Sequence, residues 1–174
     1  MFMDPVLLLQ ACHLKPTDSV ADFGAGSGQM AKAIANIVTS GEVFAVEINR
    51  DLVARIIHEV EDNHIKNIHP LWGDVEIIGG SKLGEKSVDV AVFSNILFQL
   101  DDKKNALKEA NRILKDGGHL IVVDWQESFG GLGPKPERVL NKQMAEDLIS
   151  SVGFTKLSDI KPAGEHHYAI LFKK

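Results

Sequence analysis

The sequence predicts an α/β fold with a doubly wound, mostly parallel sheet. Short apolar runs alternate along the chain with segments whose apolar residues recur at helical spacing, which is typical of βαβ units. Near the N-terminus one such run passes through a glycine-rich turn directly into a helical pattern. The 174 residues are most simply one domain, 1–174, which at this size buries roughly 70% of the surface of its unfolded chain.

The glycine-rich stretch predicts a ligand-binding turn. Residues 19–29 read Ser-Val-Ala-Asp-Phe-Gly-Ala-Gly-Ser-Gly-Gln. We expect a buried strand at the apolar start and a helix over residues 30–38, which follow helical spacing. Gly24, Gly26 and Gly28 lie between them, and glycine permits positive φ and the close approach of a ligand. The free N–H groups of the helix start face the same place.

The spacing of the turn argues against a dinucleotide. That fingerprint, G-x-G-x-x-G, places its third glycine at position 29, which is Gln29. The carboxylate of Asp22 also suits positive charge and hydroxyls better than a pyrophosphate. The run 22–28 resembles motif I of the class I S-adenosylmethionine-dependent methyltransferases, where the turn wraps the amino-acid end of the cofactor. The resemblance implies a cofactor site made here by Asp22, Phe23, Gly24, Ala25, Gly26 and Gly28; the alternative is an ordinary glycine-rich turn.

A second strand, residues 42–47, ends in an acid. Glu47 follows the glycine turn by about 20 residues, so a parallel sheet brings its carboxylate to the carboxyl end of the neighbouring strand. There it can accept hydrogen bonds from the two hydroxyls of a ribose, and the resemblance places Ile48 at the same site. This feature indicates a nucleoside without choosing between cofactors. A solvated strand-end acid is the alternative.

A third strand, residues 68–72, follows a helix over residues 51–63 and leads into Gly73-Asp74. This dipeptide resembles the adenine-binding element of the family. The resemblance implies that Asp74 accepts a hydrogen bond from the adenine amino group and that Val75 packs on the ring. A simple turn is the alternative.

The nearly continuous apolar run 87–95 predicts a central parallel strand. Ser94, Asn95 and Phe98 follow at its carboxyl end, in the position of the family's motif IV. The resemblance implies that Ser94 contacts the cofactor and that the other two line the substrate pocket; the alternative is that they finish the strand and pack the next helix. The segment lacks the Asn/Asp-Pro-Pro-Tyr/Phe motif, which disfavours methylation of adenine or glutamine nitrogen.

We expect a helix over residues 101–115, a turn over 116–118 and a fifth strand over 119–124. The phrase 109–118 resembles the quinone-methyltransferase-like branch, and its residues are interpreted as structural. A long loop, 125–138, then has the length of a functional lid. Trp125 at its start either stacks on a flat substrate or closes the end of the sheet.

The C-terminal part predicts a helix over residues 139–152 and two strands, 154–160 and 168–172, with no helix between them. Such strands pair antiparallel, which distinguishes the seven-stranded methyltransferase sheet, of order 3-2-1-4-5-7-6 with the last strand antiparallel, from the ordinary dinucleotide fold. At the other end of the chain, residues 1–16 contain a short helix capped by Asp4-Pro5, which we expect to cover the sheet or the pocket.

Composition excludes several classes of function. The net charge of −5 without a basic run disfavours nucleic-acid binding, and a single cysteine, Cys12, excludes an intramolecular disulfide or a cysteine metal cluster. His166 and His167 are adjacent on a strand and so point to opposite faces, and we expect no metal site. There is no signal-peptide pattern and no apolar run long enough for a membrane span, so we expect a cytoplasmic protein, monomeric or homodimeric.

The resemblance implies S-adenosylmethionine as cofactor and methyl transfer to carbon or oxygen of a small molecule. A protein-lysine methyltransferase and a non-catalytic S-adenosylmethionine-binding module remain open, whereas Gln29 and the C-terminal strand pair disfavour a nicotinamide oxidoreductase. Arsenite methylation is disfavoured because that chemistry needs several cysteines. No catalytic residue is assigned, because the sulfonium methyl is already electrophilic and the protein's task is positioning and the exclusion of water.

Overall fold

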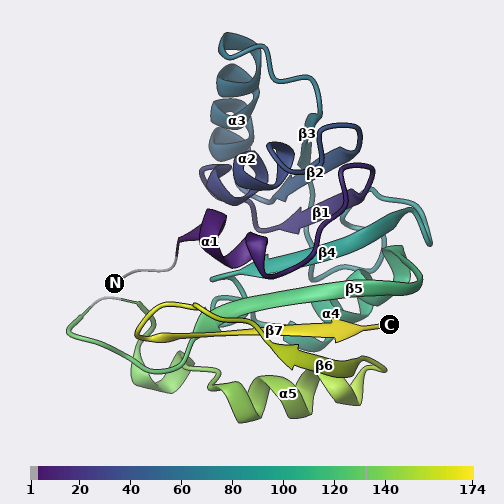
Figure 1. Ribbon diagram of the computed structural model, residues 1–174. Coiled ribbons are helices and arrows are strands. Elements are labelled where there is room, and N and C mark those ends of the chain that lie inside the picture. Colours follow the sequence, from purple (N-terminus) through teal and green to yellow (C-terminus); the bar gives the residue numbers. More distant parts are fainter. Residues whose placement is uncertain (1–3, 132) are drawn as a thin grey trace.

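The protein folds around one seven-stranded sheet of order β3-β2-β1-β4-β5-β7-β6 (Figure 1). The structure, a computed structural model, describes residues 4–131 and 133–174. The first five strands pair in parallel and β7 runs antiparallel to both of its neighbours, which confirms the predicted sheet. The strands are β1 Ser19–Phe23, β2 Glu42–Glu47, β3 Ile68–Trp72, β4 Val88–Ser94, β5 Leu114–Trp125, β6 Thr155–Asp159 and β7 His167–Lys173.

Helices cover both faces of the sheet, and each face has its own core. The helices are α1 Pro5–Gln10, α2 Gln29–Ala35, α3 Arg50–Asp62, α4 Lys103–Ile113 and α5 Lys142–Ser151, with a 3-10 turn, η1, at Pro136–Arg138. Apolar residues of α1, α2 and α3 form one core with every second residue of the central strands, and those of α4 and α5 form the other. Burial on both faces explains why the central strands read as continuous apolar runs.

Two boundaries differ from the prediction, at the start of β5 and at the start of α5. The segment 116–118, predicted as a turn, lies inside β5, because Gly117 adopts a φ of 76° and the pairing with β4 shifts register between Val88 and Val90. Such an irregularity absorbs extra residues without ending the strand. Helix α5 begins only at Lys142, where the side chain of Asn141 accepts a hydrogen bond from the N–H of Met144 (3.0 Å). The long loop therefore continues past residue 138.

The N-terminal helix α1 packs on the sheet. Asp4 caps the helix, and Leu8 and Leu9 are buried in the same core as Ile121 of β5. Pro5, its first residue, borders a cavity at the carboxyl edge of the sheet. Residues 1–3 lie outside the described residues. No helix in the part of the chain that the structure describes is long and apolar enough to cross a bilayer.

Candidate functional site

Two cavities meet at the glycine turn, where the carboxyl ends of β1, β2, β3 and β4 converge. The larger, about 250 Å³, is lined among others by Asp22, Gly26, Ser94 and Asn95. The smaller, about 50 Å³, is lined by residues of the β2 and β3 ends, namely Val46, Glu47, Ile48, Gly73, Asp74, Val75 and Glu76, together with Ile96 and Leu100. Gly24 borders both cavities, so together they form one elongated site. Doubly wound sheets bind ligands at this edge.

Asp22 places an unsatisfied carboxyl in the larger cavity. The residue is 1% exposed, and its Oδ2 has no hydrogen-bond partner among the described residues. Burial raises the pKa of Asp22 to about 7, a backbone hydrogen bond from Ala31 opposes that rise, and the charge of Glu47 adds to it. A cationic group in the cavity would stabilise the ionised carboxylate, so the site suits a ligand with positive charge at this end.

The glycine turn is shaped by backbone conformation and by close contacts. Gly24, Gly26 and Gly28 have φ values of 71°, 56° and 77°, in the region that favours glycine. A Cβ at Gly24 would lie 2.5 Å from Cδ1 of Ile96, whereas at Gly26 the nearest atom would be 3.9 Å away. The first glycine therefore allows tight packing, and the second leaves open space beside the cavity. Phe23 and Ala25, also predicted here, are buried, and only Ala25 borders the larger cavity.

Glu47 links the end of β2 to the glycine turn. Its Oε2 accepts a hydrogen bond from the N–H of Gly26 (2.9 Å), and its Oε1 accepts one from the N–H of Asn49 (2.8 Å). The side chain is thereby held in the wall of the smaller cavity, bonded to Gly26 of the larger one, with 7% exposure. Each carboxylate oxygen can accept a further hydrogen bond, so the vicinal hydroxyls of a ribose suit this group.

The end of β3 forms the other wall of the smaller cavity. Oδ1 of Asp74 accepts a hydrogen bond from the N–H of Glu76 (2.9 Å), which holds the turn after the strand, and Val75 is buried. Ile48 lines the same cavity with 58% exposure. Its carbonyl accepts a hydrogen bond from Nε1 of Trp72 (2.9 Å). Two aliphatic side chains and a carboxylate are a set that suits a flat ring with an amino group.

Of the residues predicted for the substrate pocket, only Asn95 reaches this site. Asn95 has a φ of 56°, and its buried Oδ1 has no partner among the described residues. Phe98 borders a separate cavity with the loop around Pro134. Trp125 is 9% exposed and packs its ring on His167, with 4.2 Å between ring centroids. The Trp125 ring also lies against Gly133, so it closes the end of the sheet and presents no open stacking face.

Sequence reasoning missed a group of polar residues around β5 and β7. Asp124 is 1% exposed and accepts hydrogen bonds from the N–H groups of Trp125 (2.7 Å) and Phe98 (3.2 Å). Burial raises the pKa of Asp124 to about 6, although these backbone hydrogen bonds lower it. The buried hydroxyl of Tyr168 and Nδ1 of His167 have no partner within the described residues, and both residues border a cavity of about 710 Å³. Only the adjacency of these strand ends in the folded sheet reveals the group.

The paired histidines point apart. His166 contacts Glu127 through Nδ1 (2.8 Å) and stacks on Phe129, whereas His167 faces Trp125. Across residues 4–131 and 133–174, no group of three His, Cys, Asp or Glu side chains is arranged to hold a metal ion.

The residues present fit the cofactor that the resemblance implies. The unpartnered Oδ2 of Asp22, the open space beside Gly26 and the oriented carboxylate of Glu47 lie along one cavity pair. Asp22 can pair with a cationic group, the space at Gly26 can hold an extended chain, and Glu47 can accept hydrogen bonds from hydroxyls. Asp74 can accept a hydrogen bond from an amino group.

Residues 21–122 match the family model described as a methyltransferase domain. The chain belongs to this family. It is 31% identical over 122 residues to an arsenite methyltransferase of Aquipseudomonas alcaligenes, with 67% of this chain and 34% of that protein covered. It is 28% identical over 133 residues to a ubiquinone/menaquinone biosynthesis C-methyltransferase of Legionella pneumophila, with 72% and 50% covered. The chain thus spans about a third to a half of the curated relatives it matches.

Solved structures share the fold. A SAM-dependent methyltransferase from Aquifex aeolicus superposes with a TM-score of 0.89 at 22% identity, covering 99% of this chain and 90% of that one. The [4+2]-cyclase SpnF superposes with a TM-score of 0.82 at 15% identity, covering 98% and 79%. At these identities the likeness shows the fold, and a fold can serve more than one reaction.

Proposed function

We propose that this chain binds S-adenosylmethionine and transfers its methyl group to carbon or oxygen of a small-molecule acceptor. The observation that carries the proposal is the pairing of two buried carboxylates around one glycine turn. Asp22 is unsatisfied in the larger cavity, and Glu47 in the smaller cavity is already oriented by the N–H of Gly26. This pattern matches a ligand that is cationic at one end and carries a ribose in the middle.

Each residue then has one task in binding. Asp22 offsets the positive charge of the amino-acid end, Glu47 accepts hydrogen bonds from the ribose, and Asp74 accepts one from the adenine amino group. Val75 and Ile48 enclose the adenine ring. Bound S-adenosylmethionine supplies an electrophilic methyl group. The protein's own contribution is to hold the acceptor in line and to exclude water, for which Pro5 of α1 borders the cavity on one side.

Asn95 is the residue best placed to meet an acceptor. Its Oδ1 is buried and unpartnered within the described chain, beside Ser94 and Asp22 in the larger cavity. An amide can accept from or donate to a neutral polar group, which fits a hydroxyl or an enolisable carbon acid better than a cation. The side chain orients its partner and needs no change of charge.

The nature of the acceptor separates this chain from one of its relatives. Cys12 is the only cysteine in the sequence, it is buried, and burial raises the pKa of its thiol to about 12. It is therefore not a source of thiolate for arsenite. For the class of acceptor, we therefore follow the relative named for quinone C-methylation. We further propose that residues 1–174 form one domain and that the protein is cytoplasmic and either monomeric or homodimeric.

A second candidate function is cofactor binding without methyl transfer, and a protein-lysine acceptor is the remaining alternative. The superposition with a protein named as a cyclase supports keeping the first, because this fold accommodates chemistry other than methyl transfer.

Calorimetric titration with S-adenosylmethionine, S-adenosylhomocysteine and NAD tests the proposal. We expect the first two to bind and NAD not to bind. Replacement of Glu47 by Ala removes the acceptor of the Gly26 and Asn49 N–H groups as well as of the ribose, and should weaken S-adenosylhomocysteine binding by at least about tenfold. Binding of NAD alone would contradict the proposal.

Methyl transfer is tested separately with methyl-labelled cofactor and a panel of phenols, quinols and lysine peptides. Label in a phenol or quinol supports the proposed acceptor class, and label in the peptide alone would favour a protein substrate. Tight cofactor binding with no transfer to any of them would favour the binding module.

A further inference from the structure

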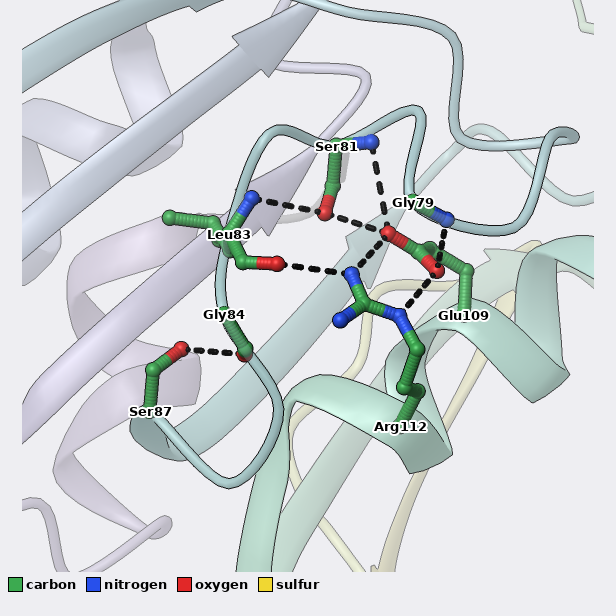
Figure 2. Close-up of polar contacts among 7 residues, drawn as sticks. All are labelled: Gly79, Ser81, Leu83, Gly84, Ser87, Glu109 and Arg112. Carbon is green, nitrogen blue, oxygen red and sulfur yellow. Dashed lines mark hydrogen bonds and ion pairs between the residues drawn. The ribbon is translucent and has the colours of Figure 1, made fainter.

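Glu109 is a fully buried carboxylate that the site described above does not use. It lies on α4 with 0% exposure, and Figure 2 shows it pointing at the loop that carries Gly79 and Ser81. Its Oε2 accepts a hydrogen bond from the N–H of Gly79 (2.8 Å). Its Oε1 accepts from the hydroxyl (2.5 Å) and the N–H (3.3 Å) of Ser81. The carboxylate therefore fixes this loop by its backbone.

Arg112 completes the coordination of Glu109. Its Nε and Nη2 donate to the two carboxylate oxygens at 2.8 and 2.7 Å, and Nη2 also donates to the carbonyl of Leu83 (2.7 Å). Burial by itself raises the pKa of Glu109, but hydrogen bonds from Arg112, Ser81 and Gly79 outweigh it and lower the pKa to about 2. Glu109 is thus ionised at neutral pH, with a partner for each oxygen.

The loop that Glu109 holds packs directly on the backbone at the end of β3. A Cβ at Gly73 would lie 2.5 Å from the carbonyl oxygen of Gly80, and a Cβ at Gly80 would lie 2.0 Å from the carbonyl oxygen of Asp74. No side chain separates the two segments, so a shift of residues 79–81 displaces Asp74 directly. Helix α4 holds the same loop at its other end, where the N–H of Asp102 donates to the carboxylate of Glu76.

We propose that Glu109 is a positioning residue for the adenine end of the cofactor site, acting through Gly79–Ser81 on Asp74. The inference rests on the proposed function, because it takes Asp74 as the acceptor of the adenine amino group. Sequence reasoning assigned the phrase containing Glu109 a structural role only. The contacts extend that role to the cofactor site, since Glu109 fixes the segment that determines where Asp74 lies.

The test compares S-adenosylhomocysteine with S-inosylhomocysteine, in which oxygen replaces the 6-amino group. The wild-type protein should prefer the adenine form by about 10- to 100-fold, because the inosine form replaces the 6-amino donor with a carbonyl oxygen, which cannot donate to Asp74. Glu109→Gln should reduce this preference to about threefold or less. Ser81→Ala retains the ion pair and removes the hydroxyl, which donates to Glu109 and accepts from the N–H of Leu83 (3.3 Å). It should reduce the preference by at least about threefold even if the first variant fails to fold.

Ile149→Ala on α5 is the matched control. Ile149 is fully buried in the same core as α4 and has no hydrogen bond to the 74–83 loop, so the variant loses stability without touching Asp74. We expect this control to keep the wild-type preference for S-adenosylhomocysteine even where its melting temperature falls as far as that of the Glu109 and Ser81 variants. It is overturned if the folded variants at Ser81 and Glu109 also keep that preference. A wild-type protein that binds both ligands equally overturns the inference and the role of Asp74 together, and one that binds neither overturns the proposed function.

Discussion

The carboxyl edge of the sheet has two halves that solve different problems. In the half that we propose for the cofactor, formed by the ends of β1, β2 and β3, backbone N–H groups hold Glu47 and Asp74, while Oδ2 of Asp22 has no partner among the described residues. In the half that we propose for the acceptor, formed by the ends of β4 and β5 and the start of β7, three residues each bury a polar atom with no partner among the described residues, namely Asn95, His167 and Tyr168. Under the proposed function, the first half meets the cofactor with two carboxylates already oriented and one, Asp22, left to pair with its cationic end, whereas the second half keeps its unpaired groups for the acceptor.

The largest effect should come from matched glycine substitutions in the two halves. Gly26 and Gly130 have φ values of 56° and 52°, so valine is similarly strained at both. A Cβ at Gly26 faces open space beside the larger cavity, and one at Gly130 meets nothing within 4 Å in the loop after β5. Gly26→Val should lower S-adenosylhomocysteine affinity at least about 100-fold, and Gly130→Val less than about threefold. Equal losses by calorimetry would remove the distinction between the halves.

A smaller effect should distinguish Asp22 from Asp124 through the pH dependence of cofactor binding. The folded-state pKa of Asp22, about 7, exceeds that of an unfolded aspartate, so its ionisation costs the empty protein stability as pH rises from about 4 to about 7. The ammonium group of S-adenosylhomocysteine favours the ionised form of Asp22, and the affinity for this ligand should therefore rise between pH 6 and 8. Asp22→Asn should abolish this rise and weaken binding by about tenfold at pH 8.

Asp124 provides the control for that titration. Its pKa is also raised, to about 6, but it accepts hydrogen bonds from Trp125 and Phe98 in the acceptor half. Asp124→Asn should leave the pH dependence of cofactor binding intact. If instead Asp124→Asn removes the pH dependence and Asp22→Asn retains it, the cationic end of the cofactor binds beside Asp124 and the proposed role of Asp22 is wrong.

The smallest effect should be optical. The two tryptophans lie one in each half: Trp72 bonds to the carbonyl of Ile48 beside the smaller cavity, and Trp125 is buried against His167. In the Trp125→Phe variant, S-adenosylhomocysteine should change the fluorescence of Trp72 by a measurable fraction. In the Trp72→Phe variant the remaining Trp125 signal should hardly change. A fluorescence change confined to Trp125 would contradict the proposed position of the adenosine beside the smaller cavity.

The sequence was sufficient to predict the sheet and the position of three acids at its edge, because both depend on local signals. The spacing between a glycine turn and the acid that ends the next strand predicts where that acid lies in a parallel sheet. Three acids lie at or next to the ends of β1, β2 and β3 as this spacing predicts, namely Asp22, Glu47 and Asp74. The bulge at Gly117 was misread because glycine at positive φ looks the same in a turn and inside a strand.

The acceptor half and the Glu109 cluster could not be predicted in the same way. Glu109 binds residues 28 and 30 positions away, and no local pattern marks that pairing. Trp125 is a loop aromatic by sequence, and only the approach of Gly133 and His167 shows that its ring is buried. Contacts of this kind are set by tertiary packing.

The two hydrogen bonds that hold Glu47 also have an entropic consequence. A free glutamate side chain samples many rotamers, and its immobilisation costs about 1.5–2 kcal/mol of conformational entropy. In this protein the N–H groups of Gly26 and Asn49 restrict those rotamers when the chain folds. The loss then falls on folding and is absent from association, so a nucleoside meets a carboxylate whose orientation no longer has to be selected.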